Sequence, residues 1–137
     1  MIDRATLLGR RRGLTELRFE RGDVSDLRAF DDGAFDVATV AMGLHEMPAA
    51  ARDGALPELL RVAGRVVVAD FAAPMPRNRA GVRNRIIERL AGRAHFAGFR
   101  AYQELGGLPA LIEAAGAEVV RERTLDQGTL VIVELTR

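Results

Sequence analysis

Residues 38–48 read ATVAMGLHEMP, and this stretch combines the end of a strand with the start of a candidate site. Its first half completes an apolar, β-prone run, residues 35–41, of the kind that is buried on both faces of a parallel sheet. Its second half changes within a few residues to glycine, histidine, an acid and proline. Ligands of α/β proteins bind beyond the carboxyl ends of strands, so we expect Met42 to Glu46 to face a ligand.

The rest of the chain alternates between helical and strand patterns. The patterns predict helices over residues 2–12, 49–62, 77–90 and 102–115, and strands over residues 17–21, 35–41, 65–71, 117–125 and 129–135. The last helix is expected to start after Gly106-Gly107 and to end at Gly116. This alternation predicts an α/β sandwich whose sheet is mostly parallel, with one antiparallel strand supplied by the closing strand pair.

The composition is that of an ordinary globular domain. The chain has 137 residues, 48% of them hydrophobic and 28% charged, which predicts one compact domain over residues 1–137. No apolar run approaches the ~18 residues that a membrane helix needs, and no signal-peptide pattern is present, so we expect a cytoplasmic protein without a membrane span. The absence of cysteine excludes disulfides, thiolate nucleophiles and cysteine-ligated zinc.

All 20 basic residues are arginines, and the net charge is only +1. A nucleic-acid-binding domain is usually strongly basic, so we expect no nucleic-acid partner. Residues 77–100 nevertheless hold seven arginines and one acid. This segment is compatible with a solvated helix face, with a surface for an anionic substrate or RNA, or with part of a lid over a hydrophobic substrate.

The pair His45-Glu46 raises the question of a metal site. Zinc peptidases place a second histidine four residues after the first, but position 49 is alanine, and His95 is the only other histidine. We therefore expect no metal site. A histidine at a strand tip can instead serve as a general base or as an orienting partner, or it can be an ordinary loop residue.

Acidic residues also follow two of the expected strands. Asp23 can accept hydrogen bonds from a ligand or cap its own turn, and Asp70 presents the same two alternatives. Ser25 is the only serine, and its surroundings do not resemble a nucleophile elbow, which argues against acyl-transfer hydrolysis.

Four segments taken together resemble class I S-adenosylmethionine-dependent methyltransferases, and most of all the ubiquinone/menaquinone-biosynthesis C-methyltransferase type. These segments are residues 17–48, 58–71, 99–116 and 123–137. The resemblance implies S-adenosyl-L-methionine as cofactor, a Rossmann-like fold and transfer of a methyl group to carbon or oxygen. The acceptor would be a small molecule.

The resemblance also implies roles for individual residues, each at a position that matches the family's pattern. Asp23 and Val24 would lie near the adenine of the cofactor, and Ala41, Met42 and Gly43 near its methionine and ribose portions. His45 would be the catalytic base, and the substrate would meet Glu46, Phe71, His95 and Tyr102.

The chain departs from the family at its N-terminal end. No Gly-x-Gly-x-Gly is present, and the first two of the usual seven strands have no counterpart, so an N-terminally truncated domain is expected. A sheet without those strands would expose strand edges, so we expect a homodimer, a missing N-terminal segment that completes the sheet, or a rearrangement. The alternative function is a non-catalytic methyltransferase-like module acting through protein–protein interaction.

Overall fold

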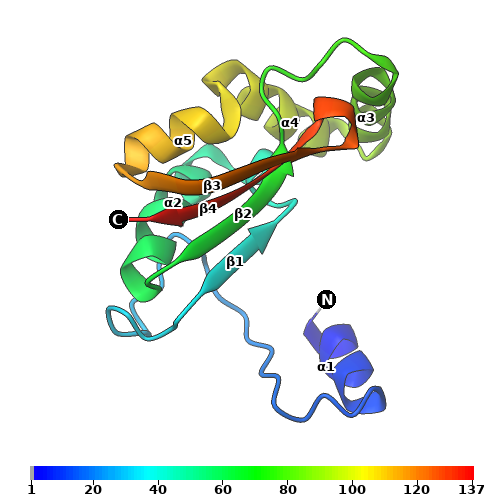
Figure 1. The fold of residues 1–137 in the computed structure, drawn as a ribbon. Coiled ribbons are helices and arrows are strands. Elements are labelled where there is room, and N and C mark those ends of the chain that lie inside the picture. The colour runs from blue at the N-terminus through cyan, green and yellow to red at the C-terminus, as the bar shows by residue number, and fades with distance from the viewer. Residues whose placement is uncertain (1) are drawn as a thin grey trace.

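A four-stranded sheet and the helices packed on one of its faces dominate the computed structural model, which describes residues 2–137 (Figure 1). In chain order the elements are α1 (Ile2–Arg11), β1 (Ala38–Ala41), the 3-10 helix η1 (Leu44–Glu46), α2 (Ala49–Val62), β2 (Val66–Phe71), α3 (Arg79–Leu90), α4 (Arg93–Leu105), α5 (Gly107–Ala115), β3 (Glu118–Leu125), the 3-10 helix η2 (Asp126–Gly128) and β4 (Leu130–Thr136).

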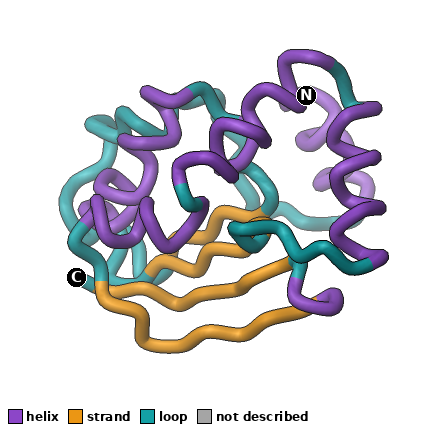
Figure 2. The backbone as a smooth tube through the Cα atoms, turned by 90° about the horizontal axis from the view of Figure 1, so that it is seen from above, coloured by secondary structure: helices purple, strands orange, loops and turns teal. Residues whose placement is uncertain are grey.

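The strand order in the sheet is β1-β2-β4-β3, and Figure 2 shows the strands as neighbours in one layer. β1 pairs with β2 in parallel, whereas β4 pairs antiparallel with both β2 and β3. Three strands therefore run in one direction and β4 runs against them. This arrangement confirms the predicted Rossmann-like α/β sheet with one antiparallel strand.

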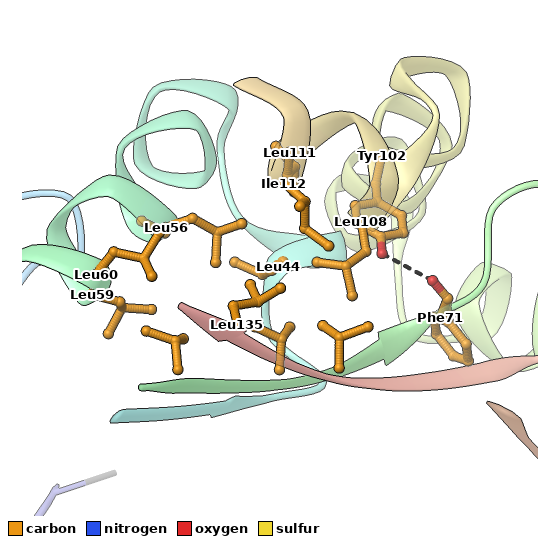
Figure 3. Packing of buried hydrophobic residues seen from close by; sticks show 14 of the residues in the cluster. Leu44, Leu56, Leu59, Leu60, Phe71, Tyr102, Leu108, Leu111, Ile112 and Leu135 are labelled. Atoms are coloured by element: carbon orange, nitrogen blue, oxygen red, sulfur yellow. Dashed lines mark hydrogen bonds between the residues drawn. The ribbon is translucent and has the colours of Figure 1, made fainter. Parts of the chain in front are cut away.

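The core lies between the sheet and the helices α2 and α5 (Figure 3). Val66 and Val68 of β2 point into it, in register with Leu135 and Val133 of β4. Both helices turn an apolar face toward the sheet, because the following side chains are all buried: Leu56, Leu59, Leu60, Leu108, Leu111 and Ile112. Each such side chain contributes about 1.5–3 kcal/mol when it is removed from water.

Helix α4 was not anticipated from the sequence. The patterns predicted one helix after the arginine-rich segment, but Gly106, at φ 99°, separates α4 from α5. Such a positive φ is strained for residues with a side chain, so glycine lets the chain turn there between two helices. The predicted helix end at Gly116 is confirmed, since that residue adopts the left-handed conformation at φ 62°.

The predicted strand over residues 17–21 is wrong. These residues form no strand, and Leu17 and Phe19 are exposed. A strand needs a neighbour that pairs with its backbone N–H and C=O groups, and no strand of the described residues lies beside this segment. In Figure 1, α1 lies apart from the sheet and the helices that cover it, at the N-terminal end of the segment that leads to β1.

No helix within residues 2–137 combines the length and the apolar character needed to cross a bilayer.

Candidate functional site

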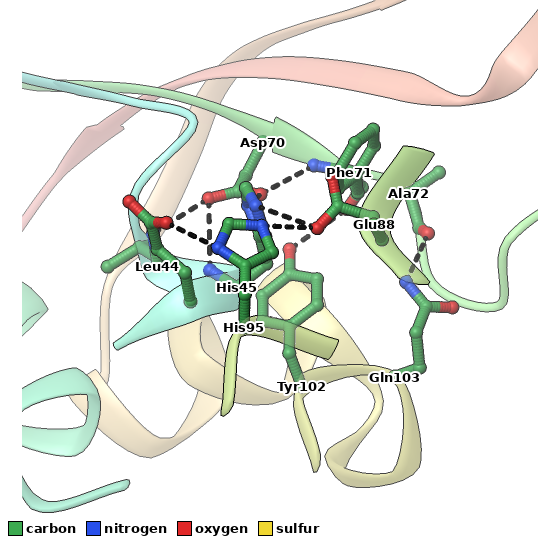
Figure 4. Close-up of polar contacts among 10 residues, drawn as sticks. Leu44, His45, Asp70, Phe71, Ala72, Glu88, His95, Tyr102 and Gln103 are labelled. Atoms are coloured by element: carbon green, nitrogen blue, oxygen red, sulfur yellow. Dashed lines mark hydrogen bonds and ion pairs between the residues drawn. The ribbon is translucent and has the colours of Figure 1, made fainter. Parts of the chain in front are cut away.

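Asp70, at the carboxyl end of β2, organises a buried polar cluster (Figure 4). Its side chain is fully buried. Oδ2 accepts a hydrogen bond from the backbone N–H of Leu44 at 2.9 Å, and Oδ1 lies 2.7 Å from Nδ1 of His45. Asp70 thus holds η1 against the strand end and orients the imidazole of His45.

The contact with Asp70 determines which nitrogen of His45 is available. A carboxylate accepts hydrogen bonds, so the proton of the neutral ring resides on Nδ1 and Nε2 carries the lone pair. Burial lowers the pKa of His45, but the hydrogen bond and charge of Asp70, together with the charges of Glu88 and Glu46, outweigh burial and raise the pKa above 6.5. Such a ring is suited to accept and hold a proton near neutral pH.

Three further side chains complete the cluster on the Nε2 side of His45. Oε2 of Glu88, from α3, lies 3.7 Å from that nitrogen and 2.6 Å from Nε2 of His95, from α4. Nδ1 of His95 lies 2.9 Å from Oε2 of Glu46. The cluster therefore joins η1 and the end of β2 to the helices α3 and α4, which follow later in the chain.

Metal-ligating atoms come together in this cluster. One ligand atom each from His45, Glu46 and His95 lie within 4.8 Å of one another. The expectation of no metal site rested on the histidine spacing along a single helix and on the presence of only two histidines in the chain. The structure instead brings a histidine from a different helix to the same place.

Phe71 and Tyr102 form the aromatic side of the cluster. The Phe71 ring centroid lies 4.8 Å from that of His45, and the Tyr102 hydroxyl donates a hydrogen bond to the Phe71 carbonyl at 2.9 Å. Burial raises the pKa of Tyr102 well above its usual value. The structure thus places all five residues predicted for catalysis and substrate binding in one neighbourhood.

Asp23, which was predicted to contact the cofactor, lies outside this cluster, in the segment between α1 and β1. Oδ1 of Asp23 accepts hydrogen bonds from the N–H and the hydroxyl of Ser25, at 2.9 and 2.7 Å, and these bonds lower the Asp23 pKa. The turn-capping alternative is therefore present in the structure. No hydrogen bond or ion pair of Oδ2 is found within the described residues, so that oxygen remains available to a ligand.

Ala41 is the last residue of β1, and Met42 and Gly43 follow it directly. Met42 has a positive φ of 52° and donates its N–H to the carbonyl of Ala69 at 2.7 Å. A positive φ in a residue other than glycine is uncommon and is often found at functional sites. Ala41 and Met42 are exposed, whereas Val24 and Gly43 are half-buried.

A groove of about 480 Å³ opens next to the cluster, between the start of α2 and helix α4. Glu46 and His95 line it, as does Arg52, a residue only 4% exposed. Nε and Nη1 of Arg52 are buried without a hydrogen-bond partner among the described residues, so a largely buried positive charge lines the groove. A second groove, of about 370 Å³, lies on α4 beside Phe96 and Phe99.

Sequence reasoning missed Glu88 and left the role of Asp70 undecided. Glu88 was visible as the single acid within seven arginines of residues 77–100. A buried position for that acid was not indicated by its neighbours along the helix. Among those arginines, Arg85 serves the fold, because its guanidinium donates to the carbonyls of Met75 and Pro76.

Solved structures with the same fold include methyltransferases and a cyclase. The chain matches the mitomycin 7-O-methyltransferase MmcR with a TM-score of 0.68 and 21% identity, over 99% of this chain and 39% of that one. It matches a SAM-dependent methyltransferase from Aquifex aeolicus with a TM-score of 0.65 and 18% identity, over 98% of this chain and 62% of that one. It also matches the [4+2]-cyclase SpnF with a TM-score of 0.67 and 16% identity, over 99% of this chain and 62% of that one. At these identities the likeness defines the fold, which is that of class I methyltransferases.

The family follows from the sequence itself. The profile of the family described as "Methyltransferase domain" matches residues 1–75, and the chain belongs to that family. No curated protein matches the chain. The chain spans less than two thirds of the length of these three structures.

Proposed function

We propose that this protein is an S-adenosyl-L-methionine-dependent methyltransferase that acts on a small-molecule acceptor. The observation that carries the proposal is the pair of His45 and Asp70, joined at 2.7 Å at the carboxyl end of a strand, in a chain of the methyltransferase domain family. Ligands of this fold class bind at that edge of the sheet. The O-methyltransferases among the similar structures support transfer to an oxygen atom.

The chain's own residues fit the two tasks of such an enzyme. When bound, S-adenosylmethionine supplies a methyl group on a sulfonium sulfur. Oδ2 of Asp23 and the exposed turn at Met42 would contact the cofactor. Nε2 of His45 would take the proton of the acceptor's hydroxyl group. The acceptor oxygen would then form a bond to the methyl carbon as the bond between that carbon and the sulfur breaks.

Two grooves along α4, one of them lined by residues of the cluster, support a small acceptor. Their volumes, about 480 and 370 Å³, lie in the range that holds drug-sized molecules. The positive charge of Arg52 favours an acceptor that carries an anionic group, and the rings of Phe96 and Phe99 favour one with apolar parts.

Calorimetric titration with S-adenosylmethionine tests the cofactor. We expect saturable binding, and we expect Asp23→Asn to weaken it, because the amide replaces one acceptor oxygen by a donor. Asp31→Asn, an exposed position in the following loop, is the matched control and should bind like the wild type. Absence of heat at millimolar cofactor would overturn the enzymatic proposal and leave a non-catalytic module.

Catalysis is tested by transfer of labelled methyl groups to a panel of small hydroxylated aromatic acids. Loss of a general base lowers turnover by about 10²–10⁴-fold, and we expect this of His45→Gln. Cofactor affinity should stay the same in that variant if His45 acts on the acceptor. An unchanged turnover would remove His45 from the mechanism.

A further inference from the structure

We propose that His45, Glu88 and His95 form a binding site for a first-row transition-metal dication such as Zn²⁺, with Asp70 and Glu46 orienting the two imidazoles. The inference rests on the geometry of the cluster and holds independently of whether the protein transfers methyl groups. It replaces the expectation of no metal site that was drawn from the sequence.

The first argument is the orientation of the two histidines. Each presents Nδ1 to a carboxylate, His45 to Asp70 at 2.7 Å and His95 to Glu46 at 2.9 Å. Each therefore directs Nε2 toward the same oxygen, Oε2 of Glu88. A carboxylate on the far nitrogen is the usual companion of a metal-binding histidine, because it fixes the tautomer and makes the ligating nitrogen more basic.

The second argument is the state of Glu88. This residue is only 5% exposed, and its Oε2 accepts no hydrogen bond of acceptable geometry, although Nε2 of His95 lies 2.6 Å away. A buried carboxylate oxygen without a donor is costly. Within the cluster itself, three carboxylates face two imidazoles, so protonation of both histidines would still leave one net negative charge among these five side chains. A dication would supply the missing positive charge.

The third argument is the distance between ligand atoms. The Nε2 atoms lie 2.6 Å (His95) and 3.7 Å (His45) from Oε2 of Glu88. Metal–ligand bonds of about 2.0–2.2 Å place neighbouring ligand atoms roughly 3 Å apart, so Oε2 of Glu88 lies near a ligand-like separation from each imidazole nitrogen. Two imidazole nitrogens and one carboxylate favour zinc or iron(II), whereas magnesium and calcium prefer ligand sets made of oxygen.

The cluster also has a route to solvent. Glu46 and His95 line the groove of about 480 Å³ beside α4, whereas His45 and Glu88 lie beneath the surface. An ion can therefore enter from the groove past His95. Once bound, it would occupy Nε2 of His45, the nitrogen that the proposed function uses as base, so we expect Zn²⁺ to inhibit methyl transfer.

Cobalt(II) titration of the metal-free protein tests the site without any need for activity. We expect one equivalent of Co²⁺ to produce visible absorption bands that Zn²⁺ abolishes by displacement. His95→Ala should weaken binding by at least about 10-fold, and Glu46→Gln by about 10–100-fold, because Glu46 orients His95. Glu104→Gln, an exposed glutamate on the same helix, is the matched control and should bind like the wild type.

A metal site and a cluster that only stabilises the fold give different results in these measurements. Circular dichroism of His95→Ala, a partly exposed residue, should show the wild-type spectrum, so weak binding will not reflect loss of the fold. Absence of Co²⁺ absorption in the wild type at millimolar ion, or equal affinity of His95→Ala and the wild type, overturns the proposal. Neither of these two outcomes changes the result of the titration with S-adenosylmethionine. Failure of the metal-site proposal can therefore be told apart from failure of the methyltransferase proposal.

Discussion

Oδ1 of Asp70 lies 2.7 Å from Nδ1 of His45, although the two residues are 25 positions apart in the chain. The contact exists because β1 and β2 are parallel neighbours, which brings their carboxyl ends to the same edge of the sheet. The protonation of His45 therefore depends on an acid from the adjacent strand.

Replacing Asp70 by asparagine should lower the pKa of His45. The hydrogen bond and charge of Asp70 are the largest contributions that raise this pKa against the opposing effect of burial. Asparagine has nearly the same shape but no charge, so burial should then dominate. NMR titration of the two histidine rings measures the change, and an unaltered His45 pKa in the variant would contradict the assignment.

The raised pKa of His45 also makes stability depend on pH. The folded state binds the proton more tightly than the unfolded chain, whose histidine titrates near 6.5. The resulting stabilisation is complete below pH 6.5 and disappears as the pH rises through the higher folded value. Urea unfolding across this range should show the decline, and Asp70→Asn should reduce or reverse it.

Tyr102→Phe should destabilise the protein by about 1–2 kcal/mol. The hydroxyl of Tyr102 is buried and donates to the Phe71 carbonyl at 2.9 Å, so its removal leaves that carbonyl without this donor. Chemical denaturation measures the loss. Phe19→Leu, at an exposed position far from the cluster, should have a much smaller effect.

Leu56→Ala should lower the free energy of unfolding by about 2–5 kcal/mol. Leu56 is 1% exposed and lies in the core between α2 and the sheet, so truncation removes buried surface and leaves a cavity. Leu90→Ala is the matched control, because Leu90 is 81% exposed at the end of α3. The control should change stability by no more than about 0.5 kcal/mol.

Arg61→Met should loosen the loop that precedes β1. The guanidinium of Arg61 donates to the carbonyls of Leu27 and Phe30, both at 3.0 Å, and also contacts Asp32 and Glu58. Methionine keeps the apolar stem but none of these donors. Faster amide hydrogen exchange over residues 27–34 would reveal the change, and unchanged exchange would show that packing alone holds the loop.

Local patterns in the sequence were sufficient for most elements. The helix over residues 49–62 has the predicted bounds, and the strand predicted over residues 65–71 differs by one residue. Apolar periodicity and glycine at a helix end depend on neighbours in the chain, which the sequence displays directly. The strand predicted over residues 17–21 failed because a strand also requires a pairing partner, which its own pattern cannot reveal.

The sequence by itself determined the α/β class, the methyltransferase family and the individual residues His45 and Asp70 at two strand ends. Only the tertiary structure decided that these residues form a pair, and that Glu88 and His95 join them from α3 and α4. Spacing along the chain records which residues share a face of one element. Contacts between residues of different elements depend on strand order and helix packing. A cluster built from four elements can therefore be identified only from the tertiary structure.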